Sequence, residues 1–201
     1  MSEVGRPRNA TKADVRVEAR GGRAVVVKDF SGRSLPVRLL VGRPALAREE
    51  RVYRRLAGLA GIPACLGREG PDRLVLELAP GTPLDRLRPG EVPPAVFDDL
   101  DRLLGEIHER GVAVADLHRS NVLVDGERVH VIDFAIARIA RRPGSPGWLV
   151  RHLQALDRHA AARLRARYLG LPEPRPEGAF GLLYRLGRGV KALLRRIRGR
   201  R

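Results

Sequence analysis

Residues 111–137 read GVAVADLHRSNVLVDGERVHVIDFAIA, and most of the recognisable chemistry of the chain is concentrated there. Asp116 and Asn121 lie five positions apart in a loop-like segment, and Asp133 ends a short apolar run. Asp125-Gly126 between them predicts a tight hairpin turn. Oxygen-bearing side chains that converge from a loop and a hairpin suit Mg²⁺, which takes one or two carboxylates and completes its shell with water and phosphate oxygens. In such a site Asp116 could also accept the proton of an attacking hydroxyl.

Asp and Asn also form turns by bonding to local backbone. The whole pattern, Asp, Asn five residues later and Asp twelve residues after that, is more specific than such turns require. It resembles the catalytic loop and the metal-binding DFG segment of the protein-kinase-like superfamily. Working outward, Lys28 in AVVVKDF resembles the strand lysine of that superfamily, and Glu49 in AREERVYRRL resembles its ion-pair partner, with the adjacent Glu50 as a rival.

Within the superfamily, the compact length and two phrases resemble the bacterial lipopolysaccharide-core kinases, the 3-deoxy-D-manno-octulosonic acid kinase group, and their RIO-like neighbours. The phrases are REERVYRRLAGLAGIP and DLHRSNVLV. The resemblance implies an α+β, two-lobed fold with a reduced, strand-rich N-lobe over 14–79 and a helical C-lobe over 80–171. It leaves 1–13 as a polar leader and 172–201 as a linker followed by a basic helix.

The resemblance also implies a reaction and its cofactors. ATP and Mg²⁺ would bind between the lobes, and the γ-phosphoryl group would pass to a hydroxyl. Asp116 would orient or deprotonate the acceptor, and Asn121 and Asp133 would hold magnesium. The nucleotide would contact Lys28 paired with Glu49, together with Glu77 and Ala79 where the strand over 74–78 enters the hinge. His118 is expected to orient the loop rather than to react.

Several departures from the family pattern affect this interpretation. No GxGxxG precedes Lys28, and Gly21-Gly22 is too short to cover phosphates well. Val114 and Ala115 replace the His-Arg pair that usually supports the loop, so we expect no control by activation-loop phosphorylation. The peptide-docking segment with its APE motif is missing, which favours a glycan or lipid-linked acceptor over Ser or Thr of a protein. A non-catalytic kinase-fold module at a membrane and a RIO-like, ribosome- or RNA-associated kinase remain as alternatives.

The formal charge of +16 indicates an anionic partner. Half of it lies in residues 178–201, which carry eight basic residues and no acid. Leu and Val residues would occupy one side of a helix there and the basic residues the other. Such a helix could bind an anionic membrane surface or pack on the C-lobe. Nucleic acid ranks third, because only 4% of residues are aromatic and base stacking needs aromatic side chains.

The chain has one cysteine, no apolar leader segment and no apolar run long enough to span a membrane. These features predict a cytoplasmic protein. If the basic helix over 178–201 binds an anionic surface rather than the C-lobe, it would attach the protein peripherally to the inner face of the cytoplasmic membrane. Periodicity and turn residues predict the secondary structure. The expected elements are a hairpin over 15–19 and 23–30, a helix over 45–60, a strand over 73–78, a helix over 95–110, a hairpin over 121–124 and 129–132, and a helix over 148–169.

Overall fold

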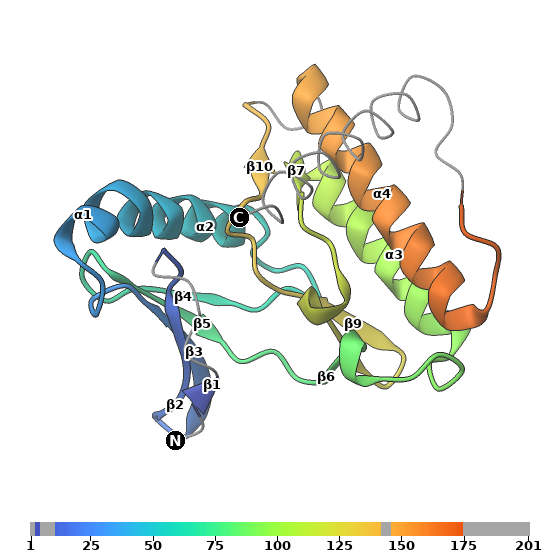
Figure 1. The fold of residues 1–201 in the computed structure, drawn as a ribbon, viewed down its shortest axis with the longest axis horizontal. Helices are drawn as coiled ribbons and strands as arrows, with labels where there is room; N and C mark the ends of the chain where they lie inside the picture. The colour runs from blue at the N-terminus through green and yellow to red at the C-terminus, as the bar shows by residue number, and fades with distance from the viewer. Residues whose placement is uncertain (1–2, 5–10, 142–145, 175–201) are drawn as a thin grey trace, which may run out of the picture.

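The computed structural model describes residues 3–4, 11–141 and 146–174. Strands gather in the N-terminal half of this part of the chain, and two long helices lie in its C-terminal half (Figure 1). The predicted α+β class, strand-rich first and helical second, is confirmed. The basic helix expected within 178–201 lies outside the described residues, and the division of the chain at residue 79 stays a prediction.

The N-terminal half is built on a five-stranded antiparallel sheet with the order β1-β2-β3-β5-β4. Its strands are β1 (Glu3–Val4), β2 (Asp14–Arg20), β3 (Arg23–Asp29), β4 (Cys65–Arg68) and β5 (Arg73–Glu77). Successive side chains of a strand point to opposite faces. Val25 and Val27 of β3 therefore pack with Val75 on one face. Val26 and Lys28 lie on the opposite face, where they line a cavity.

The hairpin predicted over 15–19 and 23–30 is confirmed as β2 and β3, which pair from Asp14 with Asp29 to Arg20 with Arg23. The strand predicted over 73–78 is confirmed as β5. Two strands were not predicted. β1 falls in the segment expected as a polar leader, and β4 has too few apolar residues to show an alternating pattern.

The helix predicted over 45–60 begins and ends earlier than expected. The structure has α1 (Leu35–Val37), a π-helical turn η1 (Arg38–Gly42) and α2 (Arg43–Arg55) in succession. Pro36 sits in the first turn of α1, where its missing N–H costs nothing. Helix α2 ends at Arg55, three residues before Gly58, whose φ of 82° does not fit a helix. A Cβ atom at Gly42 would lie 2.7 Å from the Phe30 ring, so the helix packs closely on the end of β3.

The C-terminal half consists of two packed helices and two small antiparallel sheets, one of three strands and one of two. The elements are β6 (Thr82–Pro83), η2 (Leu84–Arg86), α3 (Pro94–Glu109), β7 (Val112–Ala113), η3 (Arg119–Asn121), β8 (Val122–Asp125), β9 (Arg128–Val131), β10 (Arg138–Ile139) and α4 (Trp148–Leu169). Helices α3 and α4 lie side by side, and the β8–β9 hairpin packs against α3 (Figure 1). The two predicted helices and the hairpin are confirmed. The strands β6, β7 and β10 were not predicted, because two residues show no periodicity.

One cluster of buried apolar side chains joins the two halves. It extends from Phe30 and Leu74 near the sheet to Ile107 and Tyr168 on the long helices. The connection from α2 to β4 passes directly over β9, since a Cβ atom at Gly61 would lie 2.5 Å from the Val129 carbonyl oxygen. The junction between the halves, where the candidate site lies, is therefore packed rather than loosely linked.

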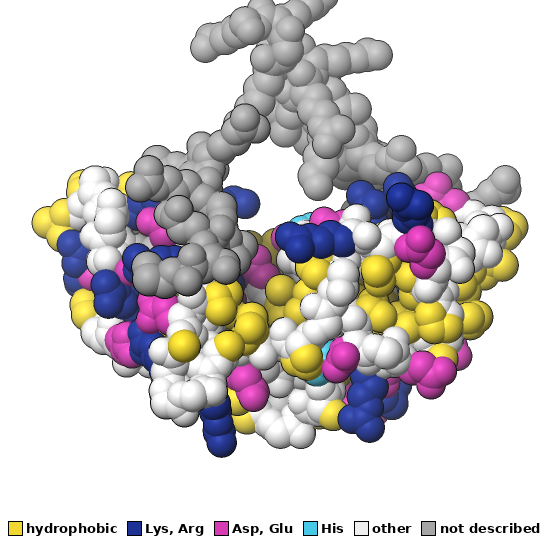
Figure 2. Space-filling model, turned by 90° about the horizontal axis from the view of Figure 1, so that it is seen from below, with side chains coloured by type: hydrophobic (Ala, Val, Ile, Leu, Met, Phe, Trp, Pro, Cys, Tyr) yellow, Lys and Arg dark blue, Asp and Glu magenta, His cyan; other side chains and the backbone are white. Residues whose placement is uncertain are grey.

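Basic and acidic side chains lie close to one another on the described surface. Figure 2 shows basic and acidic side chains interleaved on one face. Two buried carboxylates of the sheet region each pair with two arginines, Asp29 with Arg16 and Arg73, and Asp72 with Arg38 and Arg43. Among the helices of the described ranges, none has the length and apolar character that crossing a membrane requires.

Candidate active site

Three charged side chains from separate elements meet at the junction of the two halves. The Lys28 Nζ on β3 lies 2.5 Å from Glu49 Oε1 on α2 and 2.8 Å from Asp133 Oδ1, two residues after β9. Glu49 is buried, whereas Glu50 pairs with Arg54 one helical turn further on. The phase of α2 thus directs Glu49, and not its neighbour, towards Lys28.

The protonation states in this cluster follow from burial and mutual attraction. Burial lowers the pKa of the Lys28 ammonium, but the carboxylates of Glu49 and Asp133 outweigh that effect and raise the pKa above its ordinary value. Burial also raises the pKa of Glu49. For Asp133, the Lys28 charge overcomes the effect of burial, so its pKa is lowered. Lys28 is therefore a cation and Asp133 an anion at neutral pH.

The backbone at Asp133 is left-handed, with a φ of 65°, which a non-glycine residue adopts at some cost. Its backbone N–H donates to the Tyr53 hydroxyl at 3.3 Å. The next residue, Phe134, is fully buried and meets the Tyr53 ring edge to face at 5.1 Å. These contacts from α2 hold the turn that brings the Asp133 carboxylate to Lys28.

Asp116 and Asn121 belong to the 114–121 loop, which connects β7 to β8. The Asn121 side chain is buried and its amide nitrogen donates to the Asp116 carbonyl oxygen at 3.1 Å. This bond leaves the amide oxygen of Asn121 available to a cation. The Asp116 carboxylate is about half exposed (49%), so a hydroxyl from outside can reach it. The His118 Nε2 lies 3.8 Å from Asp116 Oδ2, and His118 Nδ1 lies 3.2 Å from Ser120 Oγ.

Asp157 on α4 supports the 114–121 loop and was not predicted from the sequence. Its buried carboxylate accepts the backbone N–H groups of Val114 at 2.7 Å and Ala115 at 2.9 Å, and it lies 3.2 Å from His108 Nε2. Ala115 has a φ of 65° and immediately precedes Asp116. The loop thus has the support whose loss we inferred from Val114 and Ala115. One feature of the sequence could have pointed to Asp157, because it is the only acidic residue in α4, a helix that carries five arginines.

A cavity of about 190 Å³ opens beside this cluster, and we call it the Lys28 cavity. Apolar side chains from the sheet and from the β8–β9 region form most of its walls, with Lys28 and Asp133 among the polar groups. Five of the seven predicted site residues line it: Lys28, Glu77, Ala79, Asn121 and Asp133. The other two predicted site residues, Glu49 and Asp116, do not line the cavity, but Glu49 contacts Lys28, which does. Glu77 also bonds to the Ala64 backbone through both its N–H and its carboxylate.

Comparison with solved structures identifies the fold of the chain. The Rio2 kinase from Chaetomium thermophilum superposes with a TM-score of 0.64 and 17% sequence identity, covering 85% of this chain and 58% of that structure. The chain therefore has the protein-kinase-like fold, with a strand-rich N-lobe and a helical C-lobe. No model of a protein family matches the sequence.

Two kinds of curated protein also match parts of the chain. A probable SapB synthase from Streptomyces coelicolor is 33% identical over 150 residues, which cover 60% of this chain and 16% of the synthase. A probable bifunctional tRNA threonylcarbamoyladenosine biosynthesis protein from Methanosarcina barkeri is 32% identical over 65 residues, and so is its counterpart from Methanosarcina mazei. Those matches cover 32% of this chain and 11% of each relative. The chain thus spans a small part of the curated relatives that it matches.

Proposed function

We propose that this protein transfers the γ-phosphoryl group of ATP to a hydroxyl group with the help of Mg²⁺. The observation that carries the proposal is the contact of Lys28 with both Glu49 and Asp133 at one end of the Lys28 cavity. Lys28 and Asp133 are 105 positions apart in the sequence, so their contact is made by the fold. The kinase-like fold supports a phosphotransferase in general terms.

Each of the site residues would have its own role in the reaction. Lys28 is a compact cation that would bind phosphate oxygens, and Glu49 would keep it in place. The Asp133 carboxylate and the free amide oxygen of Asn121 would hold magnesium, a hard cation that prefers oxygen ligands. Magnesium would neutralise charge on the phosphates. The exposed carboxylate of Asp116 would orient the acceptor hydroxyl and take its proton.

The Lys28 cavity fits part of a nucleotide. Its volume of about 190 Å³ is below the ~300 Å³ at which ordinary ligand pockets begin. Val26, Leu76 and Leu123 give it apolar walls that suit a purine, and Glu77 and Ala79 form part of its lining at the end of β5. The base would enter there, and the phosphates would extend to Lys28 and Asp133.

The acceptor is the finer part of the proposal. The sequence resemblance implies a lipopolysaccharide-core sugar or another non-peptide hydroxyl, with Ser or Thr of a protein as the alternative. None of the relatives named above is described as acting on lipopolysaccharide. The acceptor must therefore be found by experiment.

Labelled ATP should be incubated with the full chain and with separated lipid, glycan and protein fractions of source cells. We expect label in one fraction with the wild type and a loss of at least about a hundredfold with Asp133→Asn, which replaces the negatively charged magnesium ligand with a neutral amide. Asp125→Asn, on the exposed turn of the β8–β9 hairpin, is the matched control. Equal labelling by the wild type and Asp133→Asn would refute the role of Asp133.

One observation favours a second candidate, a non-catalytic kinase-fold module at a membrane. The β2–β3 hairpin closes on the two-residue turn Gly21-Gly22, with Arg20 opposite Arg23, so it has no long loop to cover phosphates. A module of this kind would show no thermal shift with millimolar Mg–ATP and no transfer of label. Its attachment through 178–201 would be tested by flotation with anionic vesicles, which deletion of that segment should abolish. A RIO-like, RNA-associated role instead predicts RNA that co-purifies and is released by salt.

A further inference from the structure

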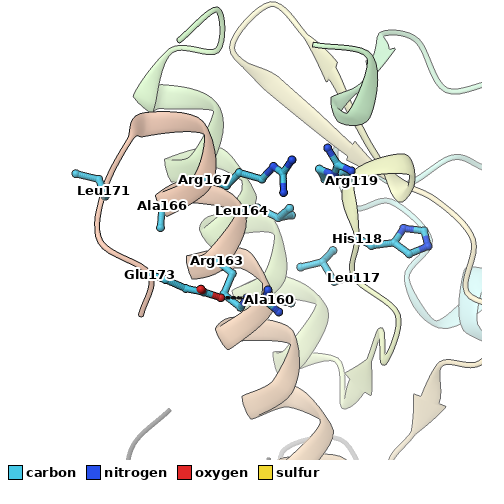
Figure 3. Close-up of a pocket in the computed structure, with 10 residues that line it drawn as sticks. All are labelled: Leu117, His118, Arg119, Ala160, Arg163, Leu164, Ala166, Arg167, Leu171 and Glu173. Carbon is cyan, nitrogen blue, oxygen red and sulfur yellow. Dashed lines mark hydrogen bonds and ion pairs between the residues drawn. The ribbon is translucent and has the colours of Figure 1, made fainter. Parts of the chain in front are cut away.

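A second cavity, of about 380 Å³, lies between the 114–121 loop and helix α4, and we call it the arginine cavity (Figure 3). Its volume falls in the range of small-molecule sites, roughly 300–1,000 Å³. Arg119 borders it from η3 and Arg167 borders it from α4. Figure 3 shows the Arg167 side chain projecting from its helix towards Arg119.

Arg119 and Arg167 have no partner for their guanidinium groups among the described residues, unlike two neighbouring arginines of α4. Arg163 donates to Glu173 at 2.7 Å, and Arg165 pairs with Asp98 and Asp101. Across the residues that the structure describes, no hydrogen bond or ion pair engages the guanidinium group of Arg119 or Arg167. The one carboxylate of the lining, Glu173, is paired with Arg163. Arg119 and Arg167 therefore face the opening with no carboxylate partner among the described residues, and they are suited to an anion because each guanidinium group offers a planar pair of donors.

The charge of the lining indicates which anion fits best. Arg119, Arg163 and Arg167 contribute three positive charges and Glu173 contributes one negative charge, so these four side chains carry a net charge of about +2. A phosphate monoester carries about −1.5 to −2 near neutral pH, which matches this excess. A carboxylate carries −1 and would leave part of it uncompensated.

The lining also contains apolar side chains. Leu117 and Leu164 line the cavity beside the arginines, and both are largely buried (Figure 3). Apolar surroundings strengthen the attraction between a guanidinium and an anion. They also provide a surface for the carbon skeleton that carries the anion.

The arginine cavity adjoins the residue that would receive the acceptor. Leu117 follows Asp116 directly, and Arg119 follows it by three positions, which an extended chain spans in about 10 Å. We propose that the arginine cavity binds a phosphate monoester group of the acceptor and so presents a nearby hydroxyl to Asp116. This inference rests on the proposed phosphotransfer function and gives its acceptor a chemical class, a molecule that is already phosphorylated.

Phenyl phosphate is a suitable probe, since it joins a phosphate dianion to an apolar ring, and benzoate is its singly charged counterpart. Calorimetric titration of the full chain without ATP should show phenyl phosphate binding more tightly than benzoate. Arg119→Ala and Arg167→Ala should each weaken phenyl phosphate binding about tenfold or more, the loss expected for a charge-assisted hydrogen bond. Arg151→Ala, which removes an exposed arginine from the same helix, should leave it unchanged.

The Lys28 cavity also has a cation for phosphate, so Lys28→Ala separates the two sites. We expect Lys28→Ala to lose Mg–ATP binding and to keep phenyl phosphate binding. If phenyl phosphate binding is lost in Lys28→Ala but unaffected in the arginine variants, the arginine cavity is not a phosphate site. Arg119→Gln and Arg167→Gln repeat the test with nearly the same side-chain volume in case the alanine variants unfold.

The acceptor class is tested with the fraction that takes up label. Treating that fraction with a phosphatase, which is then inactivated, should remove its capacity to accept label. Undiminished labelling would overturn the assignment to a phosphorylated acceptor. A different result would be RNA binding that is sensitive to salt and depends on Arg119 and Arg167, in a protein that does not bind phenyl phosphate. That result would show that the arginine cavity is a nucleic-acid site and not a site for a phosphorylated acceptor. Failure of phosphotransfer itself would appear separately, because the phenyl phosphate titration needs no ATP.

Discussion

Replacing Asp157 with alanine should destabilise the protein and slow the proposed phosphotransfer, because one buried carboxylate holds the backbone of the 114–121 loop. The variant leaves the N–H groups of Val114 and Ala115 without an acceptor, and Val114 is fully buried. An unsatisfied buried N–H costs about 1–3 kcal/mol. Because the Ala115 N–H is only part-buried, the two groups together give an expected loss of about 3 kcal/mol in the free energy of unfolding.

Asp157→Asn should lower the free energy of unfolding by about half as much as Asp157→Ala. The Asn amide keeps one oxygen that can accept one of the two backbone N–H groups, whereas its NH₂ group cannot accept the second. The measurement is urea unfolding of the full chain, followed by circular dichroism. The control is Asp85→Ala, which removes an exposed carboxylate from η2 and should change stability by no more than about 0.5 kcal/mol.

Activity provides an independent readout of the same change. Ala115 precedes Asp116, so loss of the Asp157 bonds should lower kcat, while the affinity for Mg–ATP should stay near that of the wild type because Asp157 does not line the Lys28 cavity. If Asp157→Ala and Asp85→Ala unfold at the same urea concentration, the hydrogen bonds to the loop do not have the strength inferred here. If kcat is also unchanged, Asp157 has no role in positioning Asp116.

Three further changes test other parts of the structure. Tyr53→Phe removes the hydroxyl that accepts the Asp133 N–H and should lower the free energy of unfolding by about 1 kcal/mol in urea titration. Gly61→Ala places a Cβ atom 2.5 Å from the Val129 carbonyl oxygen, and it should lower the free energy of unfolding by about 1–3 kcal/mol more than Gly58→Ala does. Gly58 is the control because it has a similar φ but open space around it. Equal losses of stability in the two variants would mean that the close approach to β9 does not contribute to stability. Hydrogen bonds from Arg43 and Arg38 lower the pKa of Asp72, so its stabilising effect is present above the unfolded pKa of about 3.9 and is lost as the pH falls through the lower folded value. Asp72→Asn should therefore flatten the acid-induced loss of stability below about pH 4 in thermal melts, and a profile parallel to that of the wild type would contradict the pairing.

Local patterns were sufficient for much of the framework. Alternating residues over 15–19, a Gly-Gly turn and a valine-rich run over 23–30 predicted β2 and β3. Helical spacing of apolar residues predicted α3 and α4. Prediction succeeded there because period and turn chemistry act between residues close in the chain. It was less accurate for α2, whose start depends on the π-helical turn and on contact with Phe30, and for the two-residue strands, which exist only through their partners.

The sequence by itself indicated candidate residues for the proposed phosphotransfer, because the spacing of Asp116, Asn121 and Asp133 is a local property of 18 residues. It favoured Glu49 and kept Glu50 as a rival, because the direction in which each of two adjacent helical residues points is set by how the helix packs. Only the tertiary structure brought Lys28 to Asp133 across 105 positions. It alone placed the Asp157 carboxylate under the 114–121 loop and formed the arginine cavity between that loop and α4. The physical reason is the same in each case: burial and electrostatic contact depend on distance in space, and the sequence records only distance along the chain.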